Sequence, residues 1–244
     1  MSPADSLSNQ GPRHTALVRI THWITVLSFA ALLVTGIELI ISHPRFYWGE
    51  VGHSQMSPLF RIPIPSSRST VPSGYGYVLP DQNGWSRYLH FEAAWALLIT
   101  GLVYLVFGLR TRHFRKNLFP APPDRTWSAV ARVIAKHLRL APPDEAEART
   151  YNVLQRVTYL FVVFVLFPLV IWTGLAMSPS FNSSFPWAVN VLGGRQSART
   201  LHFLISLSLV VFLFIHVAMI VLTGFATRMR EMTIGADPVS QEGT

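Results

Sequence analysis

The chain has no cysteine among its 244 residues. Without thiolates it cannot form disulfides, hold an iron–sulfur cluster, attach a haem through thioether bonds or use a thiol nucleophile. Charge is also scarce, because charged residues make up 13% of the chain, against about 25% in an average soluble domain. The little charge present is unbalanced, with 20 Lys and Arg against 12 Asp and Glu and a net charge of +8.

The chain contains long apolar segments. Half of the residues are hydrophobic, and they gather in four runs, at about 17–42, 88–109, 153–177 and 199–224. Each run is long enough to cross a hydrocarbon core of about 30 Å as a helix. Four such runs leave too little chain to cover them as core helices of a soluble protein. We therefore predict an all-α membrane protein with one four-helix domain at 17–224, between tails at 1–16 and 225–244.

The basic residues predict how this bundle is oriented. They crowd the connection between the second and third runs, and they recur before the first run and after the fourth. The positive-inside rule places these three regions in the cytoplasm. The prediction is an up-down-up-down bundle with both termini cytoplasmic. The basic balance then reflects membrane topology and does not indicate nucleic-acid binding.

Two long connections have a composition of their own. The outer segment 43–87 is rich in Pro, Gly and Ser and carries aromatic residues; it is expected to fold over the bundle mouth, to be ordered by a partner, or to be solvated. In the cytoplasmic connection, residues 127–138 place apolar side chains at helical spacing opposite basic ones. That pattern predicts an interfacial helix lying on anionic lipid.

Four of the nine histidines lie within the apolar runs, where an ionisable side chain usually has a function. They are His22, His90, His202 and His216. In the predicted topology His22 and His216 share the inner level, and His90 and His202 share the outer level. His202 and His216 are 14 positions apart (216 − 202), so they lie on nearly one helix face and about 21 Å apart. A single span histidine is as often an interhelical hydrogen-bonding group, but two matched pairs favour metal or haem ligation.

The composition of each pair narrows the choice of metal. Two imidazoles with no carboxylate or thiol beside them are too few for a structural zinc site. Haem brings four nitrogens of its own and needs only two axial ligands, which opposing helices of a bundle can supply. Small residues within the runs, Gly36, Gly101 and Gly174, would let the backbone approach a macrocycle. The other histidines, His14, His43, His53, His113 and His137, are predicted to be ordinary surface or loop residues.

These residues resemble a known superfamily, the four-helix, di-haem b-type cytochromes that include the formate dehydrogenase gamma subunit, the hydrogenase cytochrome b and cytochrome b561. The resemblance is carried by Arg19-Ile20-Thr21-His22-Trp23, by Thr35-Gly36 and by the histidine quartet. The segment HPRFYWGE after the first run is most similar to the thiosulfate reductase cytochrome b group. Membership would imply a multi-pass protein of the bacterial inner membrane. It would make His22 and His216 the ligands of an inner b-type haem iron and His90 and His202 those of an outer one, with Arg19 in the cofactor-binding set.

The resemblance also implies a quinone site and a partner. The segment Tyr151-Asn152-Val153-Leu154-Gln155 is similar to the family's quinone motif; Asn152 and Gln155 could hydrogen-bond a quinone carbonyl, although Asn152 could equally be a helix cap. The expected function is electron transfer between the quinone pool and a periplasmic oxidoreductase subunit, a molybdopterin or iron–sulfur protein. Two alternatives stay open: a stand-alone cytochrome b561-type oxidoreductase, and a haem-free proton-coupled transporter or anchor. A docking platform at 43–87 would favour the first function, and an open basic funnel would favour the stand-alone oxidoreductase.

Overall fold

The computed structural model describes residues 14–53, 55–64, 82–114, 119 and 153–235. Within them lie four helical spans long and apolar enough to cross a membrane, so the predicted all-α membrane fold is confirmed. The spans are α1 (Ala16–Ser42), α2 (Gln82–Arg110), a composite third span, and α9 (Arg195–Leu222). The second and fourth helices begin six (88 − 82) and four (199 − 195) residues before the predicted runs, because their first turns are polar.

The third span is continuous but not uniformly α-helical. It consists of α5 (Val153–Phe161), a π-helical segment η3 (Val162–Leu166) and α6 (Phe167–Ala176). Pro168 is the second residue of α6, and its ring would clash with a carbonyl four residues earlier in a regular α-helix. The wider turn, in which the Phe167 amide bonds to the Val162 carbonyl, accommodates the proline without breaking the span.

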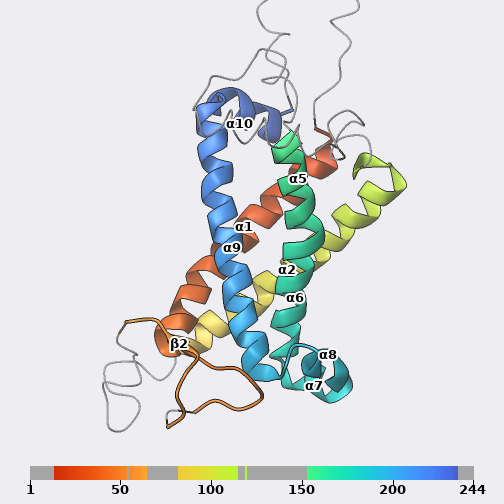
Figure 1. Ribbon diagram of the computed structural model, residues 1–244. Coiled ribbons are helices and arrows are strands. Elements are labelled where there is room, and N and C mark those ends of the chain that lie inside the picture. Colours follow the sequence, from red (N-terminus) through yellow and green to blue (C-terminus); the bar gives the residue numbers. More distant parts are fainter. Residues whose placement is uncertain (1–13, 54, 65–81, 115–118, 120–152, 236–244) are drawn as a thin grey trace, which may run out of the picture.

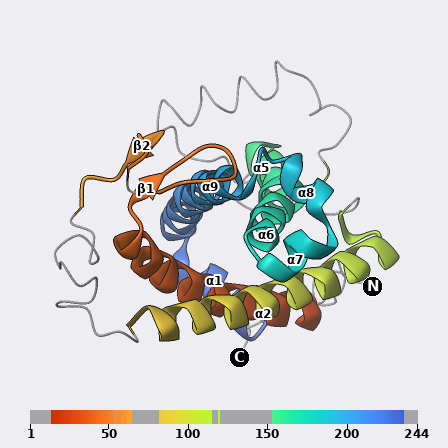
Figure 2. The ribbon, with the colours of Figure 1, turned by 90° about the horizontal axis from the view of Figure 1, so that it is seen from below.

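The spans pack as two helix pairs, α1 with α2 and α6 with α9, while direct contacts between the pairs are sparse. Figures 1 and 2 show this arrangement, with α1 and α2 crossing on one side of the bundle and α9 beside α5–α6 on the other. Neighbouring spans run in opposite directions. We call the end with the start of α1 and the end of α9 the inner end, and the opposite end the outer end.

Small side chains are buried at regular spacing on α1 and α2, the two helices of the first pair. On α1 a buried small residue recurs every seven positions, at Thr21, Ser28, Thr35 and Ser42. On α2 the same spacing gives Ser86, Ala93 and Thr100, which are also buried. Residues seven apart lie on one helix face, and small side chains allow helix backbones to approach closely in a bilayer.

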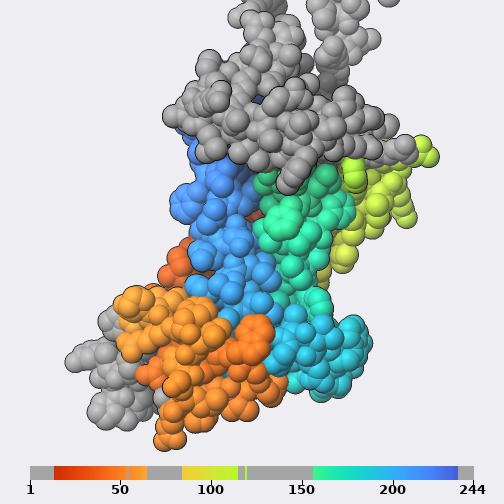
Figure 3. Space-filling view, viewed as in Figure 1, coloured from red at the N-terminus to blue at the C-terminus, as the bar shows by residue number. Residues whose placement is uncertain are grey.

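The outer end is closed by the segment that follows α1 and by two short helices. Strands β1 (Arg45–Phe46) and β2 (Phe60–Arg61) pair antiparallel, and Phe46, only 2% exposed, stacks on Phe60 and touches Phe203 of α9. Helices α7 (Pro179–Ser184) and α8 (Pro186–Asn190) lie at the same end, as Figure 3 shows. Three outcomes were expected for the 43–87 connection, and residues 43–53 and 55–64 show the one in which it folds over the bundle mouth. Residues 54 and 65–81 lie outside the described ones.

This outer segment also caps the N-terminus of α9. The Gly49 carbonyl accepts hydrogen bonds from the amides of Gln196 and Ser197 at 3.0 and 3.2 Å. The Glu50 carboxylate accepts the Arg195 amide at 2.9 Å, where a negative charge also favours the helix dipole. A side chain at Gly194, which has φ of +107°, would start 2.7 Å from the Gly49 backbone, so this junction requires glycine.

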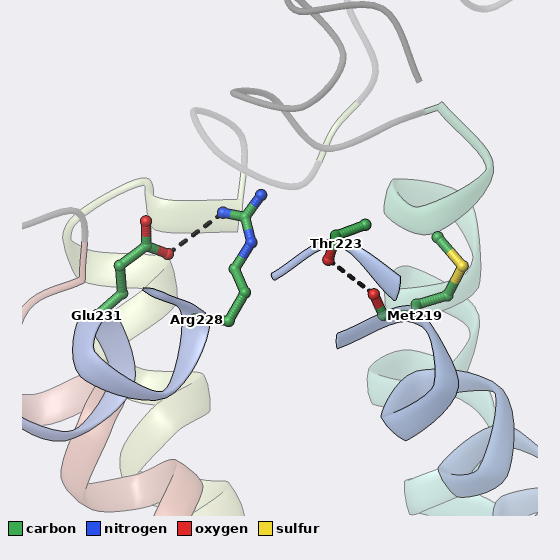
Figure 4. A network of polar contacts seen from close by, with 4 residues as sticks. All are labelled: Met219, Thr223, Arg228 and Glu231. Atoms are coloured by element: carbon green, nitrogen blue, oxygen red, sulfur yellow. Dashed lines mark hydrogen bonds and ion pairs between the residues drawn. The ribbon is translucent and has the colours of Figure 1, made fainter. Parts of the chain in front are cut away.

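At the inner end α9 turns at Gly224 into a further helix, α10 (Phe225–Thr233). Figure 4 shows the corner, where Thr223 bonds back to the Met219 carbonyl at 2.7 Å and Arg228 pairs with Glu231 at 3.2 Å. The sequence analysis expected only a tail here. The predicted interfacial helix at 127–138 lies outside the described residues.

Helix α10 folds over the start of α1. The Arg19 guanidinium donates to the Thr233 carbonyl at 3.3 Å, and the Trp23 indole donates to the Met232 carbonyl at 3.0 Å. Both bonds join the first and last described elements of the chain, so they hold the inner ends of the two helix pairs together.

Candidate functional site

The four span histidines meet as two pairs. The ring centres of His22 on α1 and His216 on α9 are 6.4 Å apart, and those of His90 on α2 and His202 on α9 are 6.3 Å apart. These are the pairs that the predicted depths gave. Each one joins the α1–α2 pair to α9, across the region where the two helix pairs otherwise touch little.

Threonine hydroxyls hold the outer pair. Thr35 Oγ1 lies 2.9 Å from His90 Nδ1, and Thr173 Oγ1 lies 3.1 Å from His202 Nδ1. His202 Nδ1 is also 3.1 Å from the Val170 carbonyl oxygen. A carbonyl can only accept, so we infer that His202 Nδ1 carries the hydrogen and that Nε2 keeps its lone pair.

Aromatic rings surround the inner pair. Trp23 meets His22 edge-on at 5.8 Å between ring centres, and Phe212 stacks on His216 at 5.6 Å. The Tyr159 hydroxyl lies 3.5 Å from His216 Nδ1, which is at the limit of a hydrogen bond. The inner rings are therefore positioned mainly by packing, and the outer rings by hydrogen bonds.

The spacing of each pair fits two axial ligands on one metal. Metal–imidazole bonds of about 2.0 Å, with each ring centre about 1.1 Å behind its nitrogen, would put the ring centres about 6 Å apart. Among the described residues, no group of three or more His, Asp or Glu comes together that could hold a metal ion. Each pair thus offers two nitrogens and no carboxylate, a donor set that suits haem and is too small for a protein-only metal site.

Two of the three small residues predicted to make room lie against these histidines. A Cβ at Gly36 would be 3.9 Å from His90 Cε1, and one at Gly174 would be 3.3 Å from His202 Cε1. Gly36 therefore lies at the outer level, as its distance of 14 residues from His22 predicts. A Cβ at Gly101 would meet nothing within 4 Å, so this glycine has no such contact.

The sequence analysis missed three residues of the outer site: Thr35 and Thr173 as partners of the histidines, and Arg199. Thr35 was noted only as part of a family motif. Arg199 lies one turn before His202, donates to the His43 carbonyl and sits 5.1 Å above the Phe46 ring. The position of Arg199 three residues before His202 could have indicated a role at this site. However, an arginine at the end of a span is also typical of a residue at the membrane interface.

Of the remaining predicted residues, Arg19 and the backbone of Gln155 lie at the inner end. Arg19 is almost one turn before His22, and its buried Nε has no hydrogen-bond partner among the described residues. Gln155 is in the first turn of α5, whereas its side chain and the whole of Asn152 are outside the described residues. Tyr159, one turn after Gln155, contacts His216.

One histidine outside the spans, predicted to be an ordinary surface or loop residue, is only partly exposed and packs among aromatic rings. His113 follows the end of α2, and its ring contacts Tyr104, Phe107 and Phe114. Burial lowers the pKa of His113 below its usual value of 6.5. By contrast, His43 caps the end of α1 and His53 belongs to the outer segment, as expected for loop positions.

Known proteins resemble the chain over most of its length. The family model described as "Prokaryotic cytochrome b561" matches residues 13–235. A putative protein-methionine-sulfoxide reductase subunit, YedZ1, of Azospira oryzae is 30% identical over 214 residues, which is 86% of this chain and 90% of that protein. A probable Ni/Fe-hydrogenase B-type cytochrome subunit of Cupriavidus necator is 26% identical over 84% of this chain and 76% of its own. A protein of the same description from Azotobacter vinelandii is 25% identical over 88% and 82%.

Proposed function

The chain belongs to the prokaryotic cytochrome b561 family, and from this membership we propose that it is a di-haem subunit carrying electrons between the quinone pool and an oxidoreductase partner. The chain is a b-type cytochrome, a multi-pass protein of the bacterial inner membrane that carries haem b and serves electron transport. The number of haems, their ligands, the quinone and the partner are what we propose.

The observation that carries the proposal is the pair of matched histidine distances. His22 with His216, and His90 with His202, would each supply two axial nitrogens to one haem iron, at ring-centre separations of 6.4 and 6.3 Å. Bound haem supplies reversible one-electron chemistry, and the protein supplies ligands, orientation and a medium of low dielectric. Because α9 provides one ligand to each site from positions 14 apart, the sites would be about 21 Å apart along the helix.

Asn152 and Gln155 are proposed to bind quinone at the inner end. Quinone diffuses within the bilayer, so its site needs polar groups at a membrane interface and a redox cofactor nearby. Gln155 lies in the first turn of α5, and Tyr159, about 6 Å further along the helix, touches His216. This arrangement supports a site within one helical turn of the inner pair.

The outer end is proposed to dock the partner. The relatives include proteins named as a reductase subunit and as hydrogenase cytochrome subunits, which supports a subunit role for this chain as well. The described outer segment is packed against α9 through Phe46 and the Gly49 carbonyl. A folded platform of this kind favours docking over a stand-alone oxidoreductase with an open basic funnel. The partner remains proposed as a periplasmic molybdopterin or iron–sulfur subunit.

Haem stoichiometry tests the core of the proposal. Pyridine haemochrome analysis of the purified full-length chain is expected to give two haems b per polypeptide. A single haem would leave one histidine pair without a role and contradict the di-haem proposal. The haem-free transporter or anchor alternative is not supported, because the chain belongs to a family of b-type cytochromes.

The quinone site is tested by Asn152→Ala. This variant is expected to keep both haems and to slow haem reduction by a short-chain quinol, because one group that could hydrogen-bond the quinol hydroxyl, or the quinone carbonyl formed from it, is lost. Asn190→Ala, at an exposed position at the end of α8, is the control at the outer end. If Asn152→Ala reduced its haem at the wild-type rate while Asn190→Ala was slow, the quinone site would have to be assigned to the outer face instead.

A further inference from the structure

Two Thr-Gly dipeptides on different spans contact the two outer histidines in the same way. Thr35 and Gly36 of α1 lie against His90, and Thr173 and Gly174 of α6 lie against His202. Both threonines are 0% exposed. Each histidine thus meets a hydroxyl at Nδ1 and a residue without a side chain beside Cε1.

The hydroxyl hydrogens are already used within the threonines' own helices. Thr35 Oγ1 lies 2.7 Å from the Ala31 carbonyl oxygen, and Thr173 Oγ1 lies 2.7 Å from that of Leu169. A hydroxyl has one hydrogen, so an oxygen that donates it to the carbonyl must accept from the imidazole. For His202 the Val170 carbonyl requires the same direction independently.

Gly174 leaves less space beside the His202 ring than Gly36 leaves beside the His90 ring. A methyl group at Gly174 would come within 3.3 Å of His202 Cε1 and 3.6 Å of Nδ1, so the ring would have to shift. At Gly36 the corresponding distance to His90 Cε1 is 3.9 Å, an ordinary van der Waals contact. The two dipeptides therefore share one design, but the α6 dipeptide fits more tightly.

We propose that Thr35-Gly36 and Thr173-Gly174 are two positioning clamps that fix the tautomer and orientation of His90 and His202, so that Nε2 of each is presented to the outer haem iron. This inference rests on the proposed function. A second-shell acceptor at Nδ1 makes a ligating imidazole more basic and stabilises the oxidised metal. The clamps would therefore lower the midpoint potential of the outer haem, and their loss would raise it.

The inner histidine pair has a different arrangement, so it can be compared directly with the outer pair in the same molecule. His216 Nδ1 has the Tyr159 hydroxyl at 3.5 Å, and no Thr-Gly contact is present there among the described residues. Thr100-Gly101 of α2 is a matched control dipeptide, because Thr100 is buried like the clamp threonines and a Cβ at Gly101 would meet nothing within 4 Å.

The test compares Thr35→Val, Thr173→Val and Thr100→Val in the full-length haem-loaded protein. Haem content, optical redox titration and the electron paramagnetic resonance signals of the oxidised haems are measured. Both clamp variants are expected to raise the midpoint potential and shift the signal of one and the same haem, the one that His202→Ala removes. Thr35→Val should have the larger effect, because His202 retains the Val170 carbonyl as an acceptor. Thr100→Val should match the wild type.

Three further variants keep the test decisive if a valine variant folds poorly. Thr35→Ser retains the hydroxyl and should restore wild-type behaviour, whereas Gly174→Ala should perturb the same haem more than Gly36→Ala does. Unchanged spectra and potentials in both valine variants, or a shift in the other haem, would overturn the clamps while the two-haem proposal stands. Fewer than two haems in the wild-type protein would overturn the proposed function itself.

Discussion

The outer and inner histidine pairs have nearly equal ring separations but are held by different forces. At the outer end, buried threonines bond to Nδ1, and a folded segment with buried Phe46 covers the helix ends. At the inner end, aromatic rings surround the histidines and the single hydroxyl contact is 3.5 Å long. Hydrogen bonds fix direction as well as distance, whereas aromatic packing leaves more freedom of rotation. The outer site is therefore the preorganised one.

Removing one ligand from each site should give the largest effect. If the two-haem proposal holds, His202→Ala and His216→Ala should each lower the haem content from two to one per chain, because each proposed site would have only two axial ligands. The remaining haem should differ between the variants in its potential and optical spectrum. His53→Ala, in the outer segment, should keep both haems. Loss of the same haem in the two span variants would contradict the assignment of two separate sites.

Alanine substitutions at two glycines, one at each end of the bundle, compare how much the outer and inner ends contribute to the free energy of unfolding. Gly194 has φ of +107° and Gly224 has φ of +105°, but only at Gly194 would a Cβ meet backbone, 2.7 Å from Gly49. Gly224→Ala should cost about 1–2 kcal/mol for the left-handed conformation alone. Gly194→Ala should cost about 3 kcal/mol or more, because its ψ of 175° places it in a backbone region that is essentially restricted to glycine and the contact with Gly49 adds overpacking. Thermal unfolding in detergent measures both, and equal losses would show that the outer segment is not closely seated.

The Tyr159 hydroxyl should contribute less than the threonines do. Tyr159→Phe removes the 3.5 Å contact with His216 but keeps the ring that packs against His216 and Phe212. The potential of the inner haem is expected to rise by less than that of the outer haem in Thr35→Val. Redox titration of the two variants side by side checks this order, and a reversed order would make the inner site the more tightly controlled one.

The smallest predicted effect is the contribution of His113, after the inner end of α2, to the pH dependence of stability. Burial lowers the pKa of His113, so the unfolded chain binds this proton more readily than the folded chain. Stability from this group is complete above the unfolded pKa of about 6.5 and declines as the pH falls below it. The melting temperature should therefore fall less between pH 7.5 and 5.5 in His113→Gln than in the wild type. Equal slopes would show that His113 does not contribute to acid sensitivity.

The spans and histidine pairs could be predicted from the sequence because both depend on position along the chain. Run length identifies the helices, loop charge gives their directions, and the depths of His22 and His216 or of His90 and His202 follow from these. The contacts around the pairs depend on side-chain geometry between distant segments. Thr-Gly also occurs at Thr100 and Thr223, so the dipeptide alone could not distinguish the two clamps.

The elements that the sequence analysis missed have weak local patterns. Helix α10 is short and rich in polar residues, including the ion pair of Arg228 with the buried Glu231, so its sequence resembles a charged tail. The capping of α9 by Gly49 and Glu50 joins residues about 145 positions apart, and no periodicity predicts such a contact. The π-helical turn is a local response to Pro168, which predicts a disturbance but not its form.

The sparse contact between the two helix pairs has a consequence for biogenesis. Each pair can insert and associate in the bilayer as a separate helical hairpin, held by its own small-residue or apolar seam. The histidines that would share a haem belong to different hairpins, His22 and His90 to one and His202 and His216 to the other. Cofactor capture would then join the hairpins, so we expect the supply of haem to control how much mature protein accumulates in the membrane.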